Sequence, residues 1–268
     1  MKEKNIKLIV TDLDGTFVNK SKEVTETNRK VVNELIERGL EFVVASGRDY
    51  TSIKDLTRDI KNIKYHICLN GAKIYKNDEI IYKKTVDREI CFDILTKATE
   101  MDINYSGTAG KDVCYSQLDT EYYKEFSLEE RNFNFISNED KKEIVARDFE
   151  KMVFYGELDH LKNLREYVEE KYSSEVNVFI SGDRIMDIVN KESNKGNALK
   201  IVSADCGISL DHVIAFGDNE NDLPMLEEAG LAVIVENAKK ILKNRIDEVT
   251  DSNEESGVGN YLNKYFKL

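Results

Sequence analysis

The chain alternates between short apolar segments and amphipathic segments, and this alternation predicts strands and helices in turn. Residues 6–11 and 40–45 are mostly apolar and rich in β-branched side chains, which is typical of buried parallel strands. Between them, residues 25–38 carry apolar side chains at helical spacing, and Gly39 follows, a common residue just past the end of a helix. Two strands joined through a helix by short connections predict a parallel βαβ unit.

The same pattern continues through the following segment and returns in the last third of the chain. We expect further elements in these two parts: a helix over 50–60, a strand over 65–69, a hairpin over 73–82, strands over 211–216 and 232–235, and helices beginning at Lys195, at 236–238 and after 259. Together with the first βαβ unit, they predict an α/β core built as a Rossmann-like, doubly wound parallel sheet.

The middle of the chain departs from this regular alternation. Its expected elements are helices over 87–101, 119–129 and 159–172, and strands over 103–106, 113–117, 133–136, 151–155, 176–180 and 184–189. Strands and helices mixed in this way predict an α+β domain over residues 84–189, inserted into a core made of residues 1–83 and 190–268. The length of 268 residues suits one large domain or two moderate ones.

Composition and charge exclude several classes of protein. Hydrophobic residues make up 41% of the chain and charged residues 34%, which is enough apolar material for a folded core. The net charge of −12 argues against a general nucleic-acid surface, because binding many phosphates requires clustered cations. No apolar run approaches the length of a membrane span, and the first residues lack a signal-peptide core. We therefore expect no nucleic-acid partner and no membrane partner.

The cysteines and histidines give little sign of a metal or disulfide framework. Cys68, Cys91, Cys114 and Cys206 are widely spaced and lie in apolar or strand-like surroundings. Buried reduced thiols are the simpler interpretation, and they fit a cytoplasmic location. The three histidines share no metal-ligand spacing, so the sequence does not favour a zinc site.

Polar residues gather directly after three of the predicted strands. The segment 12–16 (Asp-Leu-Asp-Gly-Thr) follows the first strand, 46–49 (Ser-Gly-Arg-Asp) follows the second, and 217–222 (Gly-Asp-Asn-Glu-Asn-Asp) follows the strand over 211–216. In an open α/β sheet, ligands bind outside the carboxyl ends of the strands. Taken alone, the first segment is most simply an ordinary acidic turn. The second fits a phosphate contact and a polar loop with a helix cap equally well. The acids and amides of the third segment are hard to explain as packing.

Carboxylates that converge at one edge of a sheet need a compensating cation. Asp12 and Asp14 are two positions apart in extended chain, and Asp218 and Asp222 are one helical turn apart, so each pair is expected to share a face. Two carboxylates about 4 Å apart repel by roughly 4 kcal/mol at a moderate effective dielectric constant. A hard divalent ion with oxygen ligands would relieve this repulsion and neutralise an incoming phosphate. Lys195 opposes the helix dipole unless it faces an anion, although a solvated lysine is the simpler interpretation.

Four of these segments, taken in order, resemble the motifs of the haloacid dehalogenase superfamily, most closely its Cof-type sugar-phosphatase branch with a C2-type α/β cap. The segments that carry the resemblance are 12–16, 46–48, 194–196 and 217–222, the last followed by Met225-Leu226, and Asn70-Gly71-Ala72 is also typical of this branch. The inserted domain is similar to the branch's cap in position and size only.

This resemblance implies a magnesium-dependent phosphatase that hydrolyses small phosphorylated metabolites, above all sugar phosphates, through an aspartyl-phosphate. It implies that Asp12 is the nucleophile and that Asp14 is the general acid and base. It also implies that Mg²⁺ is held by Asp12, by the backbone carbonyl of Asp14 and by Asp218. The other site residues that it implies are Ser46, Gly47, Arg48, Lys195 and Asn221 around the phosphoryl group, with Thr16 and Asp222 in support.

Two alternatives remain open from the sequence. A sugar phosphomutase of the same superfamily shares the first motif, and a non-catalytic ligand-sensing regulator could retain the fold. The chain also departs from the branch at 235–238 (Val-Glu-Asn-Ala), where Glu236 adds a carboxylate, and at Ser256, where an acid is common; both departures bear on metal affinity and substrate preference. The candidates for substrate selection in the inserted domain are Tyr105, Tyr115, Phe179 and Arg184. The sequence does not determine the oligomeric state.

Overall fold

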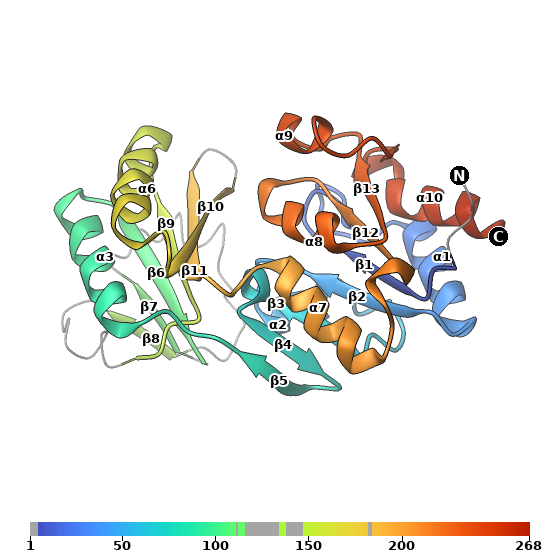
Figure 1. The fold of residues 1–268 in the computed structure, drawn as a ribbon, viewed down its shortest axis with the longest axis horizontal. Helices are drawn as coiled ribbons and strands as arrows, with labels where there is room; N and C mark the ends of the chain where they lie inside the picture. Colours follow the sequence, from blue (N-terminus) through green and yellow to red (C-terminus); the bar gives the residue numbers. More distant parts are fainter. Residues whose placement is uncertain (1–4, 111, 116–133, 138–146, 182–183) are drawn as a thin grey trace. The chain divides into compact units, whose positions relative to one another are not determined.

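The computed structural model describes residues 5–110, 112–115, 134–137, 147–181 and 184–268, and it divides the chain into two compact units (Figure 1). The first unit is discontinuous and consists of Met1–Tyr82 with Asn194–Leu268, whereas the second is Lys83–Ser193. The second unit therefore extends past residue 189, the end expected for the inserted domain. The reason is local, because the side-chain amide of Asn177 donates to the carbonyls of Lys191 and Ser193 at 2.7 and 3.0 Å and ties this connection to the second unit.

An eight-stranded sheet forms the centre of the first unit, in the order β14-β13-β12-β1-β2-β3-β4-β5. Its strands are β1 (Leu8–Thr11), β2 (Glu41–Ala45), β3 (Tyr65–Cys68), β4 (Lys73–Lys76), β5 (Glu79–Lys83), β12 (Val213–Gly217), β13 (Leu231–Val235) and β14 (Val249–Thr250). The neighbouring pairs from β14 to β3 are parallel, and β4 is antiparallel to β3. In the centre of the sheet, Val10 of β1 is paired with Val43 of β2 on one side and with Ala215 of β12 on the other.

Helices cover both faces of this sheet (Figure 1). They are α1 (Glu26–Glu37), α2 (Tyr50–Leu56), α7 (Lys195–Cys206), α8 (Leu223–Glu228), α9 (Lys240–Lys243) and α10 (Gly257–Phe266). Successive side chains of a strand point to opposite faces, so Ile9 packs in one apolar cluster with α1 and α10, whereas Leu8 and Val10 pack in another with α7 and α8. The prediction of a doubly wound α/β core is confirmed.

The helix that carries Lys195 is set by residues at its two ends. Asn194 caps the N-terminus of α7, because its side chain accepts a hydrogen bond from the backbone N–H of Asn197 at 2.8 Å. At the other end, Gly207 adopts a left-handed backbone with φ 65°, the conformation that commonly terminates a helix. These caps place Lys195 in the first turn, next to the carboxyl ends of the strands.

The second unit is built on a six-stranded sheet in the order β10-β11-β9-β6-β7-β8. Its elements are α3 (Arg88–Glu100), β6 (Asn104–Ala109), β7 (Asp112–Tyr115), β8 (Asn134–Ser137), β9 (Lys151–Tyr155), α6 (Leu158–Tyr172), β10 (Val176–Ser181) and β11 (Ile185–Asn190). Apolar residues of α3 and α6, among them Ile94 and Leu164, pack with Phe154 and Met186 of the sheet in a core of their own. The mixed α+β architecture expected for the middle of the chain is thus present, while the helix expected over 119–129 lies outside the described residues.

Several elements of the first unit begin elsewhere than the sequence pattern indicated. The short helix expected to begin at 236–238 is α9, which begins at Lys240. The strand expected from residue 211 begins at Val213, because residues Leu210–His212 form a 3-10 turn, η2, in which the N–H of His212 donates to the carbonyl of Ser209 at 2.9 Å. The last helix begins at Gly257, before the polar stretch ends. Gly259 allows this close packing, since its N–H donates to the side chain of Asn28 in α1 at 2.7 Å and an added Cβ would collide there.

Two further expectations concern membranes and thiols. Among the described residues, none of the helices is long and apolar enough to cross a bilayer. Cys68 and Cys91 are buried free thiols, and Cys206 is a partly exposed free thiol. The side chain of Cys114 lies outside the described residues.

Candidate active site

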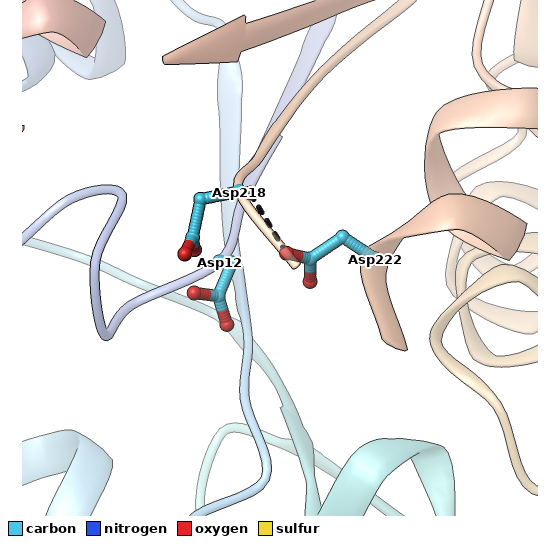
Figure 2. Close-up of side chains that lie close together, drawn as sticks. All are labelled: Asp12, Asp218 and Asp222. Carbon is cyan, nitrogen blue, oxygen red and sulfur yellow. Dashed lines mark hydrogen bonds between the residues drawn. The ribbon is translucent and has the colours of Figure 1, made fainter. Parts of the chain in front are cut away.

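The adjacent ends of β1 and β12 bring acidic side chains together at the carboxyl edge of the sheet. Asp12 directly follows β1, and its backbone N–H donates to the carbonyl of Phe216 in β12 at 2.9 Å. Asp218 directly follows β12, and Asp222 ends the 3-10 turn η3 (Glu220–Asp222). One carboxylate oxygen from each of these three aspartates lies within 4.8 Å of the others (Figure 2).

Lys195 lies between two of these aspartates and is completely buried. Its Nζ is 2.5 Å from Oδ1 of Asp12 and 2.6 Å from Oδ1 of Asp222. Burial favours the neutral amine, but the two carboxylates outweigh it and raise the pKa of Lys195. The ammonium therefore stays charged, and its contact with two anions offsets its unfavourable place at the positive end of α7.

Asp222 organises the loop after β12 through both of its oxygens. While Oδ1 accepts from Lys195, Oδ2 accepts from the backbone N–H groups of Asp218 and Asn219 at 2.9 and 3.0 Å. Figure 2 shows the bond between Asp218 and Asp222. The expectation that Asp218 and Asp222 share the face of one helical turn is therefore wrong. Asp218 belongs to the loop, and the two residues meet because Asp222 caps that loop.

Asp218 is held from the other side by the first loop. The hydroxyl of Thr16 donates to Oδ1 of Asp218 at 2.8 Å, and Thr16 is fully buried. Gly15 has φ +82°, and a Cβ built on it would lie 2.7 Å from Oδ2 of Asp218. Only glycine fits this position, because a side chain would be strained in its backbone and would collide with Asp218.

The aspartate cluster carries more negative charge than its surroundings neutralise. Burial raises the pKa of Asp12 well above its usual range, and Asp222 and Asp218 add to this, although Lys195 opposes the shift. Burial, followed by the charge of Asp222, raises the pKa of Asp218 to about 6. Lys195 supplies one positive charge against three carboxylates. A further cation with a preference for oxygen ligands, such as Mg²⁺, fits this set of residues.

Asp14 has different partners from Asp12. Its carboxylate accepts from Nε and Nη2 of Arg48 at 2.5 and 2.8 Å, and from Nζ of Lys22 at 2.7 Å. Burial works to raise the pKa of Asp14, but the bidentate contact and charge of Arg48, together with Lys22, outweigh it and lower the pKa to about 2. The two aspartates of the first segment are thus shifted in opposite directions.

The loops after β2 and β12 meet through a residue that sequence reasoning left without a role. The side chain of Asn221 donates to Oδ1 of Asn70 at 3.0 Å. The backbone N–H of Asn70 donates to the carbonyl of buried Ser46 at 3.0 Å, and the hydroxyl of Ser46 accepts from the N–H of Arg48 at 3.2 Å. A Cβ built on Gly47 would lie 3.1 Å from Oδ1 of Asn70, so this loop also packs closely on the amide.

The structure thus brings the expected site residues together in three groups. The first contains Asp12, Thr16, Lys195, Asp218 and Asp222, the second contains Asp14 and Arg48, and the third contains Ser46, Gly47 and Asn221. Lys22, which joins the second group, was not expected, because nothing in its polar turn distinguishes it from a solvated lysine. Asn70, which joins the third, could have been suspected from its position directly after a strand.

Other residues singled out in the sequence lie apart from these groups. Glu236 is exposed and does not belong to the aspartate cluster. The hydroxyl of Ser256 donates to the hydroxyl of Thr25 at 2.7 Å. In the second unit, Tyr105 is a buried core residue, Phe179 is buried, and Arg184 is exposed and pairs with Glu157 at 3.1 Å. The side chain of Tyr115 lies outside the described residues.

Comparisons with known proteins agree with this arrangement. The sequence model of the haloacid dehalogenase-like hydrolases matches residues 9–262. A Buchnera aphidicola protein, provisionally named a phosphatase, is 34% identical, and the match covers 97% of this chain and 96% of that one. The 5-amino-6-(5-phospho-D-ribitylamino)uracil phosphatase YcsE of Bacillus subtilis is 27% identical, over 95% of this chain and 93% of its own length.

Solved structures extend the likeness to the whole fold. The crystal structure of a haloacid dehalogenase-like hydrolase from Bacteroides thetaiotaomicron superposes with a TM-score of 0.83 at 26% identity, covering 97% of this chain and 99% of that one. The match therefore includes both units and every segment that carries the aspartate cluster. The chain is a member of the haloacid dehalogenase-like hydrolase family, of its Cof-type branch, and is a phosphatase.

Proposed function

We propose that the chain is a magnesium-dependent phosphatase that hydrolyses small phosphorylated metabolites, most often sugar phosphates, through an aspartyl-phosphate on Asp12. The observation that carries the proposal is the cluster of Asp12, Asp218 and Asp222 around buried Lys195 at the carboxyl edge of the sheet. For the substrate class, support comes from YcsE, whose name specifies a phosphate on a ribityl group, and from the resemblance of the motifs to the sugar-phosphatase branch.

In this proposal, the metal is held by the carboxylates of Asp12 and Asp218 and by the backbone carbonyl of Asp14. Asp222 is less suited as a ligand, because both of its oxygens already accept hydrogen bonds from Lys195 and the loop backbone. When bound, Mg²⁺ neutralises the carboxylates and the incoming phosphate and so allows two groups of like charge to approach each other. The ammonium of Lys195 also neutralises part of the charge of Asp12.

The first half of the reaction begins at Asp12. An oxygen of its carboxylate attacks the phosphorus, the bond from phosphorus to the alcohol oxygen breaks, and Asp14 gives a proton to that oxygen. In the second half, Asp14 takes a proton from water, the water oxygen attacks phosphorus, and the bond to Asp12 breaks to release inorganic phosphate. Because Arg48 and Lys22 hold the pKa of Asp14 at about 2, Asp14 has to leave these partners before it can carry a proton.

The other groups position the transferring phosphoryl group, which is where much of the catalysis of phosphoryl transfer arises. Ser46, the backbone of Gly47, Arg48 and Asn221 offer donors for its oxygens from the loops after β2 and β12. Arg48 has a planar fork suited to phosphate. We propose that it exchanges Asp14 for the phosphoryl group when substrate binds, and that the second unit acts as the cap that selects the alcohol.

The test is hydrolysis of p-nitrophenyl phosphate and of a panel of sugar phosphates in the presence of Mg²⁺. Asp12→Asn is expected to reduce turnover by at least about a thousandfold, since the amide is not a competent nucleophile. A chelator is expected to abolish turnover, and added Mg²⁺ to restore it. Asp205→Asn, on an exposed carboxylate that pairs with Lys76 at 2.7 Å, is the matched control and should keep the wild-type rate.

The nucleophile, the metal requirement and the hydrolytic outcome can each be contradicted separately. Near-normal turnover of Asp12→Asn would overturn the nucleophile assignment. Full activity in a chelator would overturn the metal requirement. Appearance of a second sugar phosphate in place of inorganic phosphate would make the chain a phosphomutase.

A further inference from the structure

The segment after β3 has an unusual backbone. Leu69, Asn70 and Gly71 form the 3-10 turn η1, and their φ angles are 53°, 56° and 93°, so three successive residues are left-handed. Leu69 and Asn70 are also buried, with 3% and 1% of their surface exposed. A left-handed leucine is strained, and such strain persists only where the surrounding structure imposes it.

The surroundings that impose this backbone belong to the candidate active site. The N–H groups of Leu69 and Asn70 donate to the carbonyls of Arg48 and Ser46, each at 3.0 Å. On the other side, a Cβ built on Gly71 would lie 2.4 Å from the carbonyl oxygen of Asn194, the residue that caps α7 and precedes Lys195. The turn η1 is therefore fitted between the loop after β2 and the start of α7.

The side chain of Asn70 adds a third connection. Its Oδ1 accepts from the amide of Asn221 at 3.0 Å, and the same oxygen lies 3.1 Å from the place where a Cβ of Gly47 would be. Asn221 directly precedes Asp222, the residue that caps the loop carrying Asp218. Asn70 thus links the loop after β2, which its backbone contacts, to the loop after β12, which its side chain contacts.

We propose that Asn70 is a positioning residue for the phosphoryl transfer, because it orients the amide of Asn221 and the backbone around Gly47 toward the phosphoryl oxygens. By accepting from one N–H of Asn221, Asn70 sets the plane of that amide and leaves its second N–H to face the substrate. This inference rests on the roles proposed above for Ser46, Gly47 and Asn221. Asn suits this position because it tolerates a left-handed backbone better than other residues with a side-chain amide.

Two substitutions separate the side chain from the backbone. Asn70→Gly removes the amide but accepts the left-handed backbone, whereas Asn70→Ala removes the amide and also strains the backbone. We expect kcat/KM to fall by roughly tenfold or more in both variants, since a misplaced donor weakens binding of the transition state. We expect only Asn70→Ala to melt at a clearly lower temperature. Asn62→Gly, at an exposed left-handed asparagine with φ 55°, is the matched control and should change neither quantity.

A double-mutant cycle with Asn221→Ala tests the connection itself. If Asn70 acts through Asn221, the combined variant Asn70→Gly/Asn221→Ala should lose little more activity than Asn221→Ala alone. Independent, multiplicative losses would show that the two side chains do not act together and would overturn the inference. Wild-type kcat/KM in Asn70→Gly would do the same, because it would reduce Asn70 to a backbone role.

Binding of inorganic phosphate, measured by calorimetry in Mg²⁺, keeps this inference separate from the proposed function. Affinity for phosphate should fall by roughly tenfold in Asn70→Gly and stay unchanged in Asn62→Gly. If the wild-type protein hydrolyses no phosphate ester, the proposed function fails, and the phosphate affinities still decide the role of Asn70. If hydrolysis is normal and Asn70→Gly binds phosphate as the wild type does, only the inference about Asn70 fails.

Discussion

The two ends of the parallel sheet in the first unit differ in whether their charged side chains are buried or exposed. At the carboxyl end, Lys195 and Asp222 are completely buried and Asp12 is nearly so. At the amino end, a hollow of about 570 Å³ is lined by several cations, among them Lys64 and Lys76. These cations are about half to one-third exposed, and each pairs with a nearby carboxylate on the surface.

The difference leads us to place the proposed site by its buried charges rather than by open space. Ion pairs on the surface contribute little to stability, since solvent screens them and their side chains stay mobile. Burying a charge is costly, so a chain that buries a lysine between aspartates must gain something from that arrangement. We therefore place the proposed chemistry at the end with buried charges rather than at the amino-end hollow. Four predictions test this contrast, in order of decreasing expected effect.

Removal of the buried ammonium should have the largest effect. Lys195→Met is expected to lower the free energy of unfolding by about 3–5 kcal/mol, because it leaves two buried carboxylates without their partner. It should also reduce kcat/KM by at least about a hundredfold. Lys200→Met, on the same helix but 48% exposed and paired with Glu228, is the matched control and should cost less than about 1 kcal/mol. Urea unfolding and a phosphatase assay measure both quantities. Equal effects of the two variants would end the contrast between buried and exposed charge.

The buried histidine of β3 should make the protein sensitive to acid. Burial, helped by Lys54 and opposed by Asp78, lowers the pKa of His66 to about 4. An unfolded histidine titrates near pH 6.5, so between about pH 6.5 and 4 the unfolded chain binds more protons than the folded chain. The stability that this group contributes is complete above pH 6.5 and is lost as the pH falls toward 4, by about 3 kcal/mol in total.

The measurement is the free energy of unfolding at pH 7 and at pH 4.5. The difference between the two values should shrink by about 2–3 kcal/mol in His66→Gln relative to the wild type. Carboxylates that titrate in this range are present in both the variant and the wild type, so their contributions cancel when the two pH differences are compared. His160→Gln, at an exposed histidine of α6, should leave the difference as in the wild type. An unchanged difference in His66→Gln would contradict the buried, neutral state of His66.

A close contact beside Lys195 should be sensitive to a single methyl group. A Cβ built on Gly196 would lie 2.4 Å from the carbonyl oxygen of Pro224, where α7 meets α8. Gly196→Ala is therefore expected to cost about 1–3 kcal/mol, although alanine normally favours a helix. Gly156→Ala, where no atom lies within 4 Å of the added Cβ, is the control and should cost much less. Thermal unfolding distinguishes them, and a neutral Gly196→Ala would show that α7 can shift.

Changes at the amino end should have the smallest effect. Lys64→Ala and Lys76→Ala each remove one surface ion pair, with Glu41 and with Asp205. We expect each to change the free energy of unfolding by less than about 1 kcal/mol and to leave kcat/KM unchanged. A clear loss of activity in either variant would mean that the amino-end hollow contributes to function after all.

The sequence predicted which polar segments meet at one edge of the sheet better than it predicted the partners of their side chains. Polar segments directly after apolar strands pointed to Asp12 and Asp218, because the carboxyl ends of parallel strands meet at one edge. Which cation each carboxylate contacts depends on the turn that follows the strand and on side-chain packing. For this reason the pairing of Asp14 with Lys22, and the capping of the β12 loop by Asp222, could not be predicted from spacing.

For the fold too, the sequence predicted the main elements but not where some of them begin or which residues have positive φ. Apolar periodicity predicted the doubly wound core and the helices α3 and α6 among the described residues of the second unit, since burial of one face sets that periodicity. It did not predict that α10 begins at Gly257, because the glycines there serve close packing, Gly259 against Asn28 and Gly257 against the backbone of Asp251, rather than a loop. The left-handed backbone at Leu69 was equally invisible, as nothing in a leucine indicates positive φ.

The place of β1 in the sheet has a consequence for how the chain folds as it is synthesised. Its neighbours are β2, which follows closely, and β12, which begins only at Val213, after the entire second unit. During translation the second unit is complete while β1 still exposes one hydrogen-bonding edge of an apolar strand. Such edges invite pairing with other chains, so the nascent protein should be most prone to aggregation in this interval, before β12 emerges.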